Sequence, residues 1–176
     1  RRGTPAAVFG VSDPQKYYLA SLSEDPVLYV APDQLAAQRA AEAIAALSGK
    51  RVTLLTAKDE VLLYQNALSK ESYFKRLNAL GEIEEGAEAI VADVEALMQV
   101  APARMARIRL RVDEEFDFSA LPSLLVKLGY SREYQVEARG AFAVRGDILD
   151  IYPINCEHPV RIDFFGDVVE KIKPYD

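Results

Sequence analysis

The sequence has few of the residues that proteins use to make covalent or metal cross-links. It contains one cysteine, Cys156, and one histidine, His158, among 176 residues. One cysteine cannot form a disulfide within the chain, and a chain without disulfides is typical of the reducing cytoplasm. One cysteine and one histidine also fall short of the four ligands of a structural zinc site. We therefore predict a cytoplasmic protein with no metal site.

Long hydrophobic runs and an excess of positive charge are also missing. No apolar run approaches the roughly 20 residues that a membrane-spanning helix needs, and the first residues lack the apolar core of a signal peptide. The chain carries 21 Lys and Arg against 27 Asp and Glu, a net charge of -6. Because neutralising phosphates needs a basic surface, this balance argues against a dedicated nucleic-acid binder. We expect no membrane contact.

An initiator methionine is missing too, because the sequence begins at Arg1 and ends at Asp176, directly after a strand-like segment. We interpret the chain as a piece of a longer protein. Its 176 residues, of which 50% are hydrophobic, suffice for one sizeable domain or two small ones.

The first hundred residues alternate strand-like and helix-like segments. Apolar runs and helical signals predict strands at 6–9, 27–31, 51–56 and 87–93 and helices at 16–22, 33–49, 69–81 and 93–100. The second helix has an N-cap residue type at Asp33 and ends at Gly49, and the third is capped by Ser69 and ends at Gly81. Strands that alternate with helices predict an α/β domain at 1–101, with a parallel sheet covered on both faces.

After Pro102 the pattern changes to short strands with turn residues between them. A helix is predicted at 117–130, capped near Ser119 and ended by Gly129. Strands are predicted at 107–112, where Arg alternates with apolar residues, and at 132–138, 141–145, 147–153, 160–165 and 168–173. Close spacing and short turns indicate antiparallel pairing. We therefore predict a smaller α+β domain at 102–176, rich in antiparallel strands.

The residues from Gly10 to Tyr17 stand where a phosphate-binding loop would stand, between an apolar run and a helix. A working loop reads G-x-x-x-x-G-K-[ST]; here Lys16 keeps its place, the second glycine is absent, and Tyr17 replaces the hydroxyl residue. Pro14 supplies no N–H, and Asp13 would set a carboxylate against the phosphates. We predict either a degenerate P-loop or a plain strand–turn–helix with a solvated lysine, and no nucleotide binding in either case.

Arginines gather in the second domain of an otherwise acidic chain. Arg132, Arg139 and Arg145 fall on a hairpin-like pair of predicted strands and their turn. Three more lie on one face of the strand predicted at 107–112, namely Arg107, Arg109 and Arg111. Arginine can pair with a carboxylate through two parallel hydrogen bonds and is frequent at interface hot spots. On spacing alone, ordinary solvent-facing residues opposite a buried face explain these arginines better.

Catalytic patterns are weak. Cys156, Glu157 and His158 are adjacent in a predicted turn, and neighbouring residues of an extended segment point to opposite sides, so they do not converge on one site. The acidic run from Glu82 to Glu88 lacks the ligand spacing of a metal site and is expected to lie on a solvated surface. We predict no catalytic residue in this chain.

The last third of the sequence has a specific resemblance. The segments GAFAVRGDILDIYP, at 140–153, and EHPVRIDFFGD, at 157–167, resemble the amino-terminal region of bacterial transcription-repair coupling factors. The same region is similar to excinuclease B, which shares this module, and the likeness extends more weakly back to the loop at Gly10. Excinuclease B keeps an intact P-loop and a long aromatic hairpin, whereas this chain has a broken loop and only a short segment between Leu63 and Ser72. Both differences favour a coupling factor.

The resemblance implies a non-catalytic module that binds the excinuclease A subunit and recruits it to stalled RNA polymerase in nucleotide excision repair. Partner contacts would fall on Arg132 and Arg145, with Arg139 and Phe142 as further candidates; a third arginine position of excinuclease B is Ala143 here. No cofactor is expected in this chain. The parent protein would hold ATP and Mg²⁺ in a separate helicase-like motor that hydrolyses ATP, and would contact RNA polymerase and DNA through other domains. The alternative is a fragment of an excinuclease B-like, ATP-dependent DNA repair protein.

Overall fold

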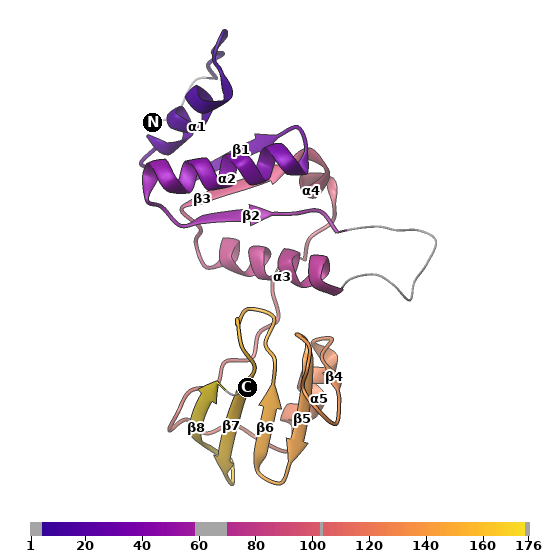
Figure 1. Cartoon of the computed structure of the whole chain (residues 1–176). Coiled ribbons are helices and arrows are strands. Elements are labelled where there is room, and N and C mark those ends of the chain that lie inside the picture. The colour runs from indigo at the N-terminus through magenta and orange to yellow at the C-terminus, as the bar shows by residue number, and fades with distance from the viewer. Residues whose placement is uncertain (1–4, 59–69, 103, 175–176) are drawn as a thin grey trace, which may run out of the picture. The chain divides into compact units, whose positions relative to one another are not determined.

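The computed structural model describes residues 5–58, 70–102 and 104–174 and divides the chain into two compact units, Arg1–Ala103 and Arg104–Asp176 (Figure 1). This division lies close to the boundary expected after residue 101. Two predictions fall outside the described residues. They are the helix cap at Ser69 and the start of the short segment that follows Leu63. No helix in the described part of the chain is both long and apolar enough to cross a membrane.

The first unit is a three-stranded parallel sheet with helices. Its strands follow the order β1-β3-β2, so β3 lies in the centre and pairs in parallel with both neighbours. The α/β class with a parallel sheet is thereby confirmed. In chain order the elements are α1 (Asp13–Ser21), β1 (Val27–Ala31), α2 (Gln34–Ser48), β2 (Val52–Leu55), α3 (Lys70–Glu84), β3 (Ala89–Asp93) and α4 (Val94–Met98).

Helix α2 has the two limits that its sequence predicts. The Asp33 carboxylate accepts a hydrogen bond from the Ala36 N–H at 2.8 Å and caps the first turn. Gly49 ends the helix with a φ of 66°, in the left-handed region that glycine adopts without steric cost. Its N–H donates to the Ala45 carbonyl at 2.9 Å, which satisfies one of the carbonyls left open at the helix end.

Small side chains pack the helices of this unit onto both faces of the sheet. On one face α2 buries four of its residues against β1 and β3: Ala37, Ala40, Ala41 and Ile44. On the other face Ala79 of α3 packs with Leu55 and Ala92. The coverage of both faces follows from the alternation of side chains along each strand.

A buried arginine ties α3 to the segments that follow β2 and α4. Arg76 is 3% exposed, and its guanidinium donates to the Thr56 carbonyl at 2.9 Å and to the Gln99 carbonyl at 3.2 Å. Burial lowers the pKa of Arg76, and the nearby Asp93 carboxylate opposes that shift. The Gln99 side chain accepts from the Lys58 N–H at 2.7 Å and donates to the Lys58 carbonyl at 3.1 Å.

The second unit is a five-stranded sheet with one short helix. The strand order is β4-β5-β6-β7-β8, and every neighbouring pair from β5 to β8 is antiparallel, as predicted, whereas β4 pairs in parallel with β5. Gly146 and Gly166 begin the two-residue turns after β5 and β7 and take the positive φ that such turns need, 59° and 60°. The elements are α5 (Leu121–Lys127), β4 (Ser131–Arg132), β5 (Ala141–Arg145), β6 (Ile148–Ile151), β7 (Val160–Phe165) and β8 (Val168–Pro174).

The core of the second unit consists of large apolar side chains between the sheet and α5. Leu121 and Leu125, one helical turn apart, are the buried residues of α5. They pack against buried residues of β5, β6, β7 and β8, namely Phe142, Leu149, Ile151, Ile162, Phe164 and Val169.

Helix α5 has Ala120 as its N-cap residue and no side-chain cap, so the cap predicted near Ser119 is wrong. The Asp117 carboxylate accepts from the Ser119 hydroxyl at 2.7 Å and from the Ala120 N–H at 3.1 Å. These hydrogen bonds stabilise the charged form and lower the pKa of Asp117. Ser119 therefore donates to Asp117, and Asp117 holds the turn that leads into α5 through the N–H of Ala120.

Two predicted strands, at 6–9 and 107–112, are wrong. The first has strand-like composition but pairs with no strand of the described chain, and Phe9 is 88% exposed. The second is irregular, yet Ile108 and Leu110 pack against the core of the second unit. Its alternation therefore records which residues are buried, because an irregular segment that crosses a core produces the same pattern as a paired strand.

Of the strand predicted at 132–138, only Arg132 lies in a strand, at the end of β4. The Glu133 N–H still donates to the Phe142 carbonyl at 2.8 Å, but no residue from 133 to 138 lies in a strand. The hairpin expected between 132–138 and 141–145 is therefore wrong, since β4 and β5 run parallel.

Helix α3 passes Gly81, its predicted end, and continues to Glu84. Ile83 packs in the cluster under the sheet, and the Glu82 carboxylate accepts from the Thr53 hydroxyl at 2.8 Å. These contacts outweigh the roughly 1 kcal/mol that glycine costs in a helix interior.

Candidate protein-binding surface

One face of the sheet in the second unit is polar. Because side chains alternate along a strand, residues between the core positions point to the opposite face, which we call the outer face. The strand register aligns two rows across it: Ala143, Asp150, Arg161 and Lys173, and then Arg145, Ile148, Asp163 and Lys171. These paired positions hold four cations and two carboxylates. The outer face is thus locally positive in an acidic chain.

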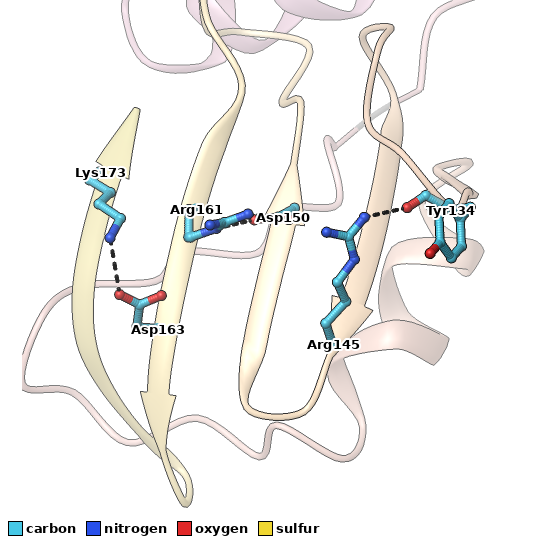
Figure 2. A network of polar contacts seen from close by, with 6 residues as sticks. All are labelled: Tyr134, Arg145, Asp150, Arg161, Asp163 and Lys173. Carbon is cyan, nitrogen blue, oxygen red and sulfur yellow. Dashed lines mark hydrogen bonds and ion pairs between the residues drawn. The ribbon is translucent and has the colours of Figure 1, made fainter. Parts of the chain in front are cut away.

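An ion pair anchors the first row (Figure 2). The Arg161 guanidinium donates from Nε to Asp150 Oδ1 at 2.6 Å and from Nη2 to Asp150 Oδ2 at 2.8 Å. The side chain of Asp150 is 4% exposed and that of Arg161 is 31% exposed. Two parallel bonds fix the guanidinium plane, so Arg161 is held against β6 with most of its charge already compensated.

Arg145 is held differently, by a backbone carbonyl and an aromatic ring (Figure 2). Its Nη2 donates to the Tyr134 carbonyl at 2.7 Å, and its guanidinium carbon lies 5.4 Å from the centre of the Tyr134 ring. No carboxylate in the described part of the chain pairs with Arg145, which is exposed. The charge is therefore available to a partner, while the ring and the carbonyl restrict its rotamers.

Phe165 is a further candidate that the sequence analysis missed. It ends β7 two residues after Asp163, on the same face, and is 80% exposed. Aromatic and arginine side chains are enriched at the hot spots of protein interfaces, and this face presents both kinds. The sequence signal for Phe165 was its position directly after Phe164. Successive residues of a strand point to opposite faces, so only one of the two rings can point into the core.

Arg139 lies beside another aromatic residue. Its guanidinium carbon lies 5.6 Å from the centre of the Tyr152 ring, and the Tyr152 hydroxyl donates to the Glu157 carbonyl at 2.6 Å. Burial raises the pKa of Cys156, against the opposing effect of Arg139. A raised pKa disfavours the thiolate, which does not suit a nucleophile.

Arg132 and Phe142 lie away from the outer face. They are register partners in the parallel pair of β4 and β5, and Phe142 is 0% exposed in the core. Phe142 therefore packs the fold, and its predicted role of excluding water at a partner surface does not fit this burial. Arg132 is exposed beside α5, on the opposite side of the sheet from Arg145. The two main predicted contacts do not share one face.

The arginines at 107, 109 and 111 do not form the predicted row, since this segment is not a strand. Arg111 instead pairs with Glu114 at 3.2 Å, and both side chains are more than half exposed. Such an exposed pair contributes about 0–1 kcal/mol.

The segment around Gly10 is a turn into α1, which begins at Asp13, ahead of the predicted start. Gly10 has a φ of 70°, and the Ser12 N–H donates to the Gln15 side chain at 2.8 Å. Lys16 Nζ donates to the Asp13 carboxylate at 2.8 Å, and this bond raises the pKa of Lys16. The lysine is therefore paired within its own helix. The descent of this loop from a P-loop stays a prediction.

Tyr17, at the position of the missing hydroxyl residue, packs edge-on against Tyr29 of β1, with ring centres 5.8 Å apart. A depression of 530 Å³ in this unit is lined by Glu42, Glu71 and Lys75 among others, and Lys75 pairs with Glu71 at 2.9 Å. Its carboxylates would repel phosphate groups. Within residues 5–58, 70–102 and 104–174, no three histidine, cysteine or acidic side chains gather as a metal site requires.

Comparison with known proteins shows what the chain is similar to. Residues 108–176 match the family model of the UvrB interaction domain. A transcription-repair-coupling factor of Myxococcus xanthus is 34% identical over 164 residues, which cover 86% of this chain and 14% of that protein. One from Bacillus subtilis (strain 168) is 30% identical over 164 residues, which cover 90% of this chain and 14% of the relative.

A UvrABC system protein B is also similar, over a shorter range. The protein of Thermotoga neapolitana is 41% identical over 69 residues, 39% of this chain and 10% of that relative. The chain therefore spans a small part of every relative named here, and the activities of those whole proteins are not carried by the match. The resemblance to transcription-repair coupling factors, drawn from two motifs, is confirmed.

Proposed function

We infer that the second unit is a docking module of nucleotide excision repair. The chain resembles transcription-repair-coupling factors over most of its length, and residues 108–176 match the UvrB interaction domain. The proposed partner is the excinuclease A subunit, which the resemblance of the motifs implies. The proposed role is recruitment of that subunit to stalled RNA polymerase, without catalysis by this chain. The match of residues 108–176 carries this proposal.

The outer face supports docking through its chemistry. Arg145 presents an unneutralised guanidinium next to the exposed ring of Tyr134, and Phe165 adds an exposed aromatic ring on the same face. Arginine and aromatic side chains dominate interface hot spots, and arginine pairs well with acidic groups of a partner. We assign the excinuclease A contact to this face, with Arg139 on the same unit as a further candidate, and we place Arg132 outside it.

Other activities belong to the parent protein in this proposal. ATP and Mg²⁺ would bind a separate helicase-like motor, and RNA polymerase and DNA would contact further domains. The pairing of Lys16 with Asp13 supports a first unit that does not bind nucleotide, because the lysine is engaged within α1. The first unit would then serve as a scaffold.

Surface plasmon resonance with immobilised excinuclease A subunit tests the assignment. Arg145→Glu should weaken binding of the chain by about 2–5 kcal/mol, the usual cost of losing one arm of a desolvated charge pair. Phe165→Ala should cost more than about 1 kcal/mol if the ring is a hot spot. Arg132→Glu is the matched control, since it makes the same charge reversal on the opposite side of the sheet.

Arg132→Glu should bind as the unaltered chain does. Equal losses from Arg145→Glu and Arg132→Glu would show that net charge, and not the outer face, governs binding. Unchanged binding by Arg145→Glu together with Phe165→Ala would overturn the site. No binding by the unaltered chain would overturn the proposed partner.

A further inference from the structure

A groove on the opposite side of the same sheet runs between α5 and β4. It has a volume of 330 Å³ and is lined by Pro122, Ser123, Val126, Lys127, Arg132 and Phe142. Leu121 and Leu125 turn the other side of α5 into the core, so Pro122 and Val126, one turn apart, face the groove. Val126 is 56% exposed, although it is one of the most apolar residues of the helix.

The chain folds back on itself to form this groove. Gly129 takes a φ of 90° after α5, and the Tyr130 N–H donates to the Leu125 carbonyl at 3.0 Å. This turn, which favours glycine, sets β4 alongside the helix that precedes it. The groove therefore has Pro122 and Val126 of α5 on one wall and Arg132 on the other, with the buried residue Phe142 behind them.

Both charged residues of the groove are cations. Lys127 and Arg132 are exposed, and neither makes a side-chain hydrogen bond or ion pair with any residue that the structure describes. The lining includes no aspartate or glutamate. In a chain of net charge -6, two uncompensated cations around an apolar hollow create a local preference for anionic groups.

The backbone of β4 adds a directional feature. The N–H groups of Ser131 and Glu133 donate to the Gly140 and Phe142 carbonyls of the neighbouring chain segment, both at 2.8 Å. Because backbone groups alternate in direction along a strand, Arg132 turns its own N–H and carbonyl away from β5. β4 is the edge of the sheet, so these two groups point toward the open side.

We propose that this groove, which we call the α5–β4 groove, is a second docking site for a short, extended acidic peptide with one apolar side chain. The apolar side chain would enter between Val126 and Arg132 and contact Pro122 and Val126, and acidic residues on either side would pair with Lys127 and Arg132. The peptide backbone would exchange hydrogen bonds with Arg132 at the open edge, as in strand addition. This site is separate from the outer face and does not depend on the proposed excinuclease A contact.

The observations favour a peptide over a nucleic acid. A phosphate backbone is bound by rows of cations along its length, whereas this groove offers two. Pro122 and Val126 suit an aliphatic side chain, and the N–H and carbonyl of Arg132 at the open strand edge match the paired donor and acceptor of a peptide backbone. The inference thus rests on three features of the same site: shape, charge and free backbone groups.

A titration of the isotopically labelled whole chain, followed by amide NMR shifts, tests the proposal. The probe is a capped peptide with one leucine between two pairs of glutamates, and the controls are the same peptide with alanine for leucine, the same peptide with lysine for glutamate, and a short DNA duplex. The glutamate–leucine peptide should shift amides of 123–127 and 131–133. Lys127→Glu and Arg132→Glu should each weaken its binding about fivefold, the range of one exposed ion pair.

Arg145→Glu is the variant control, because it changes the outer face and should leave the peptide affinity unchanged. Saturable shifts confined to the groove, lost with the lysine peptide and weakened with the alanine peptide, support the proposal. Shifts that map to the outer face, an equal response to the lysine peptide, or stronger groove shifts with the duplex overturn it. The absence of saturable shifts at the groove also overturns it, whatever the result for excinuclease A.

Discussion

The two units of this chain pack helix against sheet with side chains of different size. In the first unit α2 buries mainly alanines, such as Ala37 and Ala40. In the second unit the core consists of leucine, isoleucine, valine and phenylalanine, with Phe142 and Leu149 fully buried. Short side chains bring helix and sheet close together, whereas large ones bury more apolar area per residue.

The two units therefore differ in how their buried apolar area is distributed among residues. The first unit spreads burial over many small contacts and leaves larger apolar residues of β1, Leu28 and Val30, about half exposed, at 53% and 49%. The second unit concentrates burial in a few large side chains. A single truncation should therefore damage the second unit more than the first.

The largest expected effect comes from Phe142→Ala. Truncating a fully buried phenylalanine typically costs about 3–5 kcal/mol, which is a large part of the stability of a small domain. Amide hydrogen exchange can follow each unit separately, through the Leu149 amide in the second and the Val91 amide in the first. The free energy of opening at Leu149 should fall by about that amount, and the value at Val91 should stay unchanged.

Ile44→Val is a smaller truncation in the first unit, at the largest fully buried side chain among the residues described there. It should cost about 0.5–1.5 kcal/mol at Val91 and nothing at Leu149. If Phe142→Ala lowers protection equally at both amides, the units unfold together, and the contrast between their cores does not govern stability.

The fold of the first unit was largely predictable because its signals are local. Periodicity and end signals gave α2 its limits at Asp33 and Gly49, and alternation of strands with helices gave the parallel sheet. The strand predicted at 6–9 was wrong because a strand needs a neighbour, and composition carries no information about pairing. Helix α3 ran past Gly81 because tertiary contacts outweighed a local preference.

The candidate site of the second unit was less predictable, because the face of a residue depends on its pairing partner. A parallel pair usually needs a connection of about a dozen residues or more, so the short link from Arg132 to Ala141 suggested a hairpin. The parallel pairing puts Arg132 and Arg145 on opposite sides of the sheet. The likeness to a family indicated both Arg132 and Arg145 as partner contacts. Only the strand register shows that the two residues lie on opposite sides of the sheet.

A smaller loss of stability should follow from Asp150→Ala. This change compares the two units by the groups that hold their buried or partly buried arginines. In the first unit buried Arg76 is satisfied by carbonyls, whereas in the second Arg161 relies on the Asp150 carboxylate. Breaking a buried ion pair costs about 3–5 kcal/mol, but Arg161 is partly exposed and water can replace some of the loss, so about 1–3 kcal/mol is expected. Urea unfolding, read at the Leu149 amide, measures it.

Asp163→Ala is the control for this change, since Asp163 pairs with Lys173 at 3.6 Å on the same face and both side chains are more exposed. It should cost about 0–1 kcal/mol. Equal losses from Asp150→Ala and Asp163→Ala would mean that the bidentate geometry of Asp150 and Arg161 adds nothing to stability.

The smallest expected effect depends on pH and comes from Asp117→Ala at the start of α5. Hydrogen bonds from Ser119 and Ala120 lower the pKa of Asp117 in the folded state, so the folded state favours the charged carboxylate. The stabilisation is therefore fully present above the ordinary aspartate pKa and is lost as the pH falls through the lower folded value. The difference in unfolding free energy between the unaltered chain and Asp117→Ala should be largest near neutral pH and shrink in acid. Val91 in the first unit should show no such difference, because Asp117 belongs to the second unit. A difference that stayed constant into acid would show that the Asp117 side chain acts through packing and not through its charge.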